Sequence, residues 1–145
     1  MFSMVLKLLV AFAGGAAAAL QGTLASFMGQ RVGLMASVFI VHVGGTLLAA
    51  LLLLGQGGGN IGQWRTLPWY ALGAGTLGVV ILSAINYSIP RLGVGTTITI
   101  LVTAQLTVGA IVDHFGLLGT AVRPFDLNRS AGMATLVAGT WLMLR

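Results

Sequence analysis

The sequence predicts an all-α integral membrane protein with five transmembrane helices. Of its 145 residues, 57% are hydrophobic and only 6% are charged, whereas soluble domains carry about a quarter charged residues. Apolar stretches near the roughly 20 residues that a helix needs to cross a bilayer recur along the chain. All tryptophans and tyrosines lie near the ends of these stretches, as in an interfacial aromatic belt. They are Trp64, Trp69, Tyr70, Tyr87 and Trp141.

The predicted spans form one transmembrane domain over residues 1–145. They cover about 4–26, 33–54, 68–88, 92–112 and 130–144. The first begins like a signal peptide, with Lys7 before an apolar run, but its apolar character continues and four further stretches follow. A first span is therefore the better interpretation. The last stretch has only 15 residues, so we expect it to borrow a turn from the preceding loop.

The cationic side chains are nearly balanced across the membrane in this topology. Four lie on the side of the N-terminus (side A) and three on the other (side B). An excess of Lys and Arg on the cytoplasmic side normally sets orientation. Either one residue decides a single weak orientation, or copies insert both ways up. We predict dual topology, with two inverted copies pairing as an antiparallel ten-helix homodimer. Side A holds Lys7, Arg65, Arg123 and Arg129, and side B holds Arg31, Arg91 and Arg145.

Composition excludes several function classes. The cations are isolated residues without a basic run, which argues against nucleic-acid binding. With no cysteine, disulfides and thiolate metal sites are impossible. Two acids and two histidines form neither a catalytic triad nor a metal-ligand spacing. We therefore expect no enzyme activity, no cofactor and no metal.

Small residues recur at helical spacing and predict close helix packing, which replaces the hydrophobic effect inside a membrane. The first span carries the clearest such face, with Gly14, Ala18, Gly22 and Ala25.

Polar residues at membrane depth are costly and indicate functional positions. We predict a substrate pathway that includes Gln21, His42, Thr103 and Gln105. Thr103 shares one face of the fourth span with other threonines, and Gln105 faces elsewhere, so this span is expected to be central. Hydroxyl-to-backbone bonds are the alternative for the threonines, and interhelical bonds are the alternative for the glutamines. Asn86, near a span end, is interpreted as structural.

Proton coupling has three candidate residues. His42 is the only ionisable residue near the middle of a predicted span, and a neutral, hydrogen-bonded imidazole is its alternative role. Asp113 and His114 end the fourth span, where they could relay protons or order the following loop.

The run from Gln105 to Gly119, followed by Arg123-Pro124 and by 129–132, resembles the YdcZ-type inner-membrane proteins. Those form a five-span branch of the drug/metabolite transporter superfamily. Gln21 and residues 36–45 fit the same pattern, so the resemblance covers nearly the whole chain. It implies a multi-pass protein of the bacterial inner (plasma) membrane that occurs as single, paired or fused five-span units.

These observations predict a secondary transporter that moves a small organic metabolite or drug by alternating access at a homodimer interface. Its partners would be a second copy, the lipid bilayer and an unknown small molecule. A dual-topology ion channel is one alternative, and a non-transporting membrane subunit of a hetero-oligomer is the other.

Overall fold

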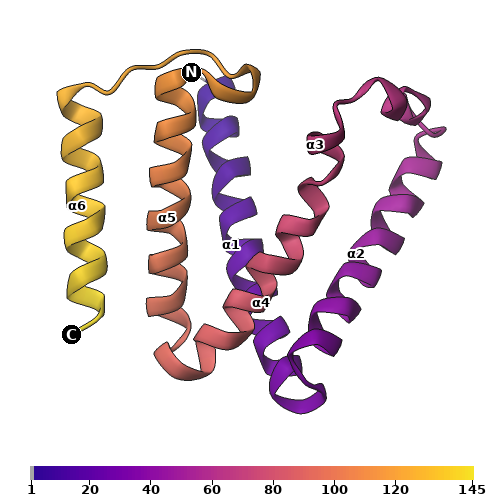
Figure 1. Cartoon of the computed structure of the whole chain (residues 1–145), viewed down its shortest axis with the longest axis horizontal. Helices are drawn as coiled ribbons and strands as arrows, with labels where there is room; N and C mark the ends of the chain where they lie inside the picture. Colours follow the sequence, from indigo (N-terminus) through magenta and orange to yellow (C-terminus); the bar gives the residue numbers. More distant parts are fainter. Residues whose placement is uncertain (1) are drawn as a thin grey trace. The chain divides into compact units, whose positions relative to one another are not determined.

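Most of the chain is helical. The structure is a computed structural model that describes residues 2–145, with side chains from residue 4. No strand occurs among these residues, so the all-α prediction is confirmed. Two compact units follow each other along the chain, one up to Arg91 and one from Leu92 to Arg145. The helices are α1 (Phe2–Val32), α2 (Leu34–Gly55), η1 (Ile61–Thr66), α3 (Trp69–Leu72), α4 (Ala74–Leu92), α5 (Val94–Phe115), η2 (Leu117–Gly119) and α6 (Leu127–Met143) (Figure 1).

Four helical segments are long and apolar enough to cross a membrane. They are Met4–Val32, Leu34–Gly55, Trp69–Leu92 and Val94–Phe115. α6 begins before the predicted 130, so it does borrow a turn from the loop, but its 17 residues reach only about 26 Å at 1.5 Å per residue. Since a bilayer core is about 30 Å thick, a fifth span remains a prediction.

Two helix boundaries differ from the hydropathy pattern. α1 continues to Val32, beyond the predicted end at 26, because a helix persists until its backbone is interrupted and not until its side chains become polar. The third predicted span, 68–88, is two helices, α3 and α4, that meet at Gly73. Pro90 lies inside the last turn of α4, where its missing N–H leaves the Asn86 carbonyl without its usual helical donor.

A single glycine separates α1 from α2, and another separates α4 from α5. Gly33 has φ 91° and ψ 152°, and Gly93 has φ 80° and ψ 164°. This region is essentially restricted to glycine, because a Cβ clashes with the backbone there. Both glycines lie two residues after an arginine that stacks on an aromatic ring one turn earlier, Phe27 under Arg31 and Tyr87 under Arg91. The two corners are thus built in the same way.

In the first unit, the buried core lies close to the Gly33 corner. Figure 1 shows α1 and α2 meeting at this corner and separating toward their other ends. Glycine allows the close approach of α1 to α4, because a Cβ at Gly22 would lie 3.1 Å from the Ile85 side chain. A Cβ at Gly14 would meet nothing within 4 Å. Only part of the predicted small-residue face is therefore used inside this unit. The buried apolar residues are Ala25, Val38, Leu82, Ile85 and Ile89.

In the second unit, α5 and α6 lie side by side and are joined by a connector across one end (Figure 1). Gly95 contributes to their contact, because a Cβ there would lie 3.4 Å from the Met143 side chain. None of the apolar residues described in this unit is buried. Most of its apolar surface is therefore available to lipid or to another chain.

Alanine at either corner should destabilise the protein. Gly33→Ala and Gly93→Ala each place a Cβ in a backbone region that costs about 1–3 kcal/mol for other residues. Gly14→Ala is the matched control, because this helical glycine has open space around it and alanine should gain about 0.5–1 kcal/mol there. Thermal unfolding in detergent measures all three, and unchanged midpoints in both corner variants would contradict this account of the corners.

Candidate functional site

A polar junction joins α1, α2 and α4 near the Gly33 corner. The Ser37 hydroxyl of α2 donates to the Ala25 carbonyl oxygen of α1 at 2.6 Å. The Asn86 amide of α4 donates to the Ser37 hydroxyl oxygen at 3.3 Å. Ser37 is fully buried and Asn86 nearly so. Asn86, which was predicted to be structural, makes an interhelical bond, whereas no role was predicted for Ser37.

His42 of α2 is half-buried and faces α4. Its Nδ1 lies 2.8 Å from the Val38 carbonyl oxygen one turn earlier. Because a carbonyl only accepts, Nδ1 carries a proton, and Nε2 of the neutral ring is then an acceptor. A Cβ at Gly78 would lie 2.9 Å from Nε2. His42 therefore occupies a notch that the glycine creates on α4.

Both predicted glutamines have exposed side chains. Gln21 lies on α1 and Gln105 on α5, and neither makes a side-chain hydrogen bond with another described residue. An amide at membrane depth needs hydrogen-bond partners, because lipid supplies none. Each glutamine therefore has donors and acceptors available for a ligand, water or another chain.

The threonine face of α5 is directed at α6. Thr103 Oγ1 lies 2.6 Å from Thr140 Oγ1 of α6, and it also bonds the Thr99 carbonyl within α5 at 2.9 Å. Thr96 Oγ1 donates to the Met143 carbonyl at 3.4 Å. Thr103 thus links α5 to α6 and also bonds the backbone of its own helix.

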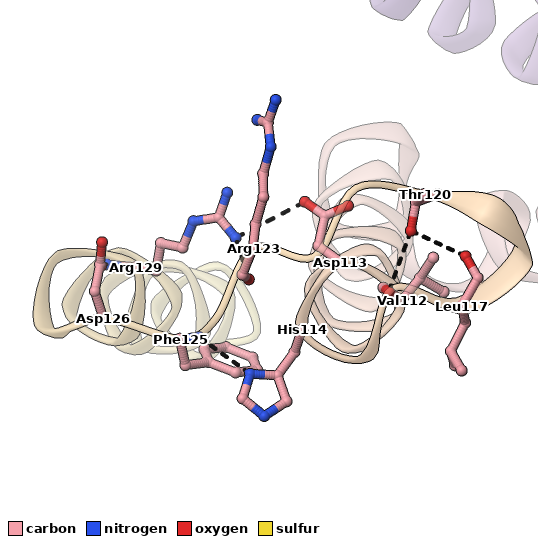
Figure 2. A network of polar contacts seen from close by, with 9 residues as sticks. All are labelled: Val112, Asp113, His114, Leu117, Thr120, Arg123, Phe125, Asp126 and Arg129. Atoms are coloured by element: carbon pink, nitrogen blue, oxygen red, sulfur yellow. Dashed lines mark hydrogen bonds and ion pairs between the residues drawn. The ribbon is translucent and has the colours of Figure 1, made fainter.

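Asp113 and its neighbours fix the connector between α5 and α6 (Figure 2). The Asp113 main-chain carbonyl accepts from the Arg123 N–H at 2.8 Å, and its carboxylate lies 3.8 Å from Arg129. Arg129 also donates to the Arg123 carbonyl at 3.0 Å. The Asp126 side chain caps α6 by accepting from the Arg129 N–H at 2.7 Å. These contacts support the loop-ordering interpretation of Asp113.

His114 contacts the same connector. The Phe125 N–H donates to His114 Nδ1 at 3.1 Å, so Nδ1 is unprotonated and the proton of the neutral ring is on Nε2. The ring lies against Phe115 and Phe125, with centroid distances of 4.7 and 5.2 Å. Figure 2 shows Asp113 and His114 directed to different parts of the connector. No direct hydrogen bond links these two side chains into a relay.

The predicted site residues belong to different units. Gln21 and His42 lie in the first, and Thr103, Gln105, Asp113 and His114 in the second. Among the described residues, no group of three or more acids and histidines could hold a metal ion. A pocket of about 350 Å³ opens at η1, and none of the predicted site residues lines it. Its lining residues are Asn60, Ile61, Gln63, Trp64, Thr66 and Leu67.

Long apolar helices with exposed apolar surfaces and interhelical polar contacts define a multi-pass α-helical membrane protein. Residues 6–142 match the family described as "Putative inner membrane exporter, YdcZ". The chain is 32% identical to the "Inner membrane protein YdcZ" of Escherichia coli (strain K12) over 104 residues, which are 71% of this chain and 69% of the relative. No solved structure matches. The chain belongs to the YdcZ family of inner-membrane proteins, as the resemblance of the α5 region indicated.

Contact between His42 and Gly78 predicts a coupled effect of substitutions. Gly78→Ala should lower stability by about 1–2 kcal/mol, because the new Cβ displaces a ring that is held by its bond to Val38. In a His42→Ala background the same substitution should cost nothing. A double-mutant cycle of thermal unfolding measures this coupling, and equal costs in both backgrounds would show that the two residues do not interact.

Proposed function

We propose that the protein is a secondary transporter that moves a small organic metabolite or drug out of the cell by alternating access. Membership of a family described as an inner-membrane exporter carries this proposal. The amide groups of Gln21 and Gln105 would contact the substrate, and Thr103 would hold α5 against α6. His42 would couple transport to protons, because it is the only ionisable residue near the middle of a predicted span.

We further propose that the transporter is an antiparallel homodimer of two inverted copies. The near-balance of cations between sides A and B supports dual topology. The side-chain amides of Gln21 and Gln105 support an assembly larger than one chain, because they have no partner among the described residues and lipid supplies none. Two inverted copies would supply the two-fold related halves that alternating access uses in many transporters.

Arginines at the helix ends bear on this topology. Each cation of side B lies at or just beyond the C-terminal end of a helix, where the dipole favours positive charge. Each stacks on an aromatic ring four residues earlier, with Arg145 lying 3.9 Å from the Trp141 ring centroid. Because each arginine is held against its own helix, its charge would lie at a fixed depth on side B. These three charges would offset the topological effect of the four cations on side A.

Orientation is tested directly with single cysteines, because the chain has none. Ala121→Cys reports the α5–α6 connector, and a cysteine appended after Arg145 reports the opposite side. In intact cells, a membrane-impermeant maleimide should label about half of each variant if both orientations are populated. Complete labelling of one variant and none of the other would overturn dual topology.

Transport is tested in proteoliposomes with compounds selected by their thermal stabilisation of the purified protein. Uptake or efflux should follow an imposed pH gradient, and His42→Gln should abolish this dependence while the variant remains folded. His114→Gln is the matched control, since it changes the other histidine and should keep the gradient dependence. If His42→Gln retains it, proton coupling at His42 is wrong. Flux at channel-like rates that ignores every gradient would favour the ion channel, and flux that requires a different membrane protein would favour the hetero-oligomer.

A further inference from the structure

Buried polar atoms without hydrogen-bond partners gather on the facing sides of α1 and α4. Ser26 Oγ, Ser83 Oγ and Asn86 Oδ1 have no partner among the described residues of the first unit. Ser26 is 1% exposed and Asn86 is 7% exposed. Inside a membrane, such atoms are costly unless a partner is supplied. Three of them on one seam therefore point to a bound partner.

The hydrogen bonds of Ser37 determine which Asn86 atom faces α1. A hydroxyl has one proton, and Ser37 gives it to the Ala25 carbonyl. Its oxygen can then only accept, so the Asn86 atom beside it must be the amide nitrogen. The other amide atom, Oδ1, lies 3.2 Å from the position of a Cβ on Gly29 of α1. The junction thus holds an acceptor in place against α1.

Ser26 faces this contact between α1 and α4, and Ser83 lies one turn before Asn86 on α4. Gly22 and Gly29 both contact α4. Ser26 lies four residues after Gly22 and three residues before Gly29. Helical residues at these spacings share one face, so the Ser26 hydroxyl is directed at α4. Ser83 precedes Asn86 by three residues, so its hydroxyl lies beside the Asn86 side chain on α4.

We propose that a water molecule bound between α1 and α4 bridges Ser26, Ser83 and Asn86. Ser26 and Asn86 are almost completely buried, so a partner that reaches both must be small. Asn86 Oδ1 needs a donor, and the two hydroxyls can donate or accept, a combination that water satisfies. A sodium ion could also bind neutral oxygens, but Arg31 and Arg91 lie at the same helix ends and disfavour a cation.

This site has a use that does not depend on the proposed transport function. When two helices separate, a bridging water between them can leave and later return, whereas a direct side-chain bond between them has to break. The contact between α1 and α4 can therefore open and close more easily than the contact between α1 and α2, which the direct bond between Ser37 and Ala25 holds.

The sign of a stability change tests the proposal. If Ser26 is truly unpaired, Ser26→Ala removes a buried unsatisfied hydroxyl and should raise the unfolding midpoint. If water bridges it, the same substitution should lower the midpoint by roughly 2–8 °C. We expect lower midpoints for Ser26→Ala and for Ser83→Ala. Ser88→Ala is the matched control on α4, because its side chain is not among the buried unpaired groups, and its midpoint should hardly change.

The double variant Ser26→Ala/Ser83→Ala tests whether one ligand is shared. With a common water, the second substitution should cost less than it does alone. Raised midpoints in both single variants, or strictly additive losses, would overturn the shared site. Midpoints are also compared in NaCl, KCl and choline chloride at equal ionic strength. A sodium-specific rise that Asn86→Leu removes would overturn the assignment to water in favour of a cation.

Discussion

The hydrogen bond from the Ser37 hydroxyl to the Ala25 carbonyl constrains the first unit more than any other contact. Its acceptor is a backbone carbonyl of α1, so α2 must come close to the α1 backbone. Small residues are needed at that point to allow this close approach. It also assigns the orientation of the Asn86 amide, which extends the contact to α4. Interhelical hydrogen bonds in membranes contribute about 0.6–2 kcal/mol each. The buried apolar residues gather around this bond and not along the full length of the helices.

Hydropathy and helical spacing predicted much of the fold, because bilayer thickness and backbone hydrogen bonding leave few alternatives. They located the helices but not all of their ends. α1 continues past residue 26 to the Gly33 corner, and α3 and α4 break at Gly73 within an apolar stretch. Polar partners were harder to predict. A serine such as Ser37 usually bonds its own helix, and its actual acceptor depends on how α1 and α2 cross.

The predicted polar site residues differ in how fully their hydrogen bonds are satisfied. Thr103 is bonded both to Thr140 and to its own backbone, so its hydroxyl has limited capacity for a further ligand. The side-chain amides of Gln21 and Gln105 have no such bonds to described residues. The sequence showed where the two glutamines lie within the spans. It did not show that their amides lack hydrogen-bond partners, because this depends on residues from other helices. A second copy or a substrate could therefore form new hydrogen bonds with these two amides more readily than with Thr103.

The one-residue corner at Gly33 has a consequence for biogenesis. Since α1 and α2 contact each other directly after this corner, neither can enter the bilayer far ahead of the other. We therefore expect the pair to insert as a helical hairpin with Arg31 near its tip, so that α1 and α2 take their orientation together.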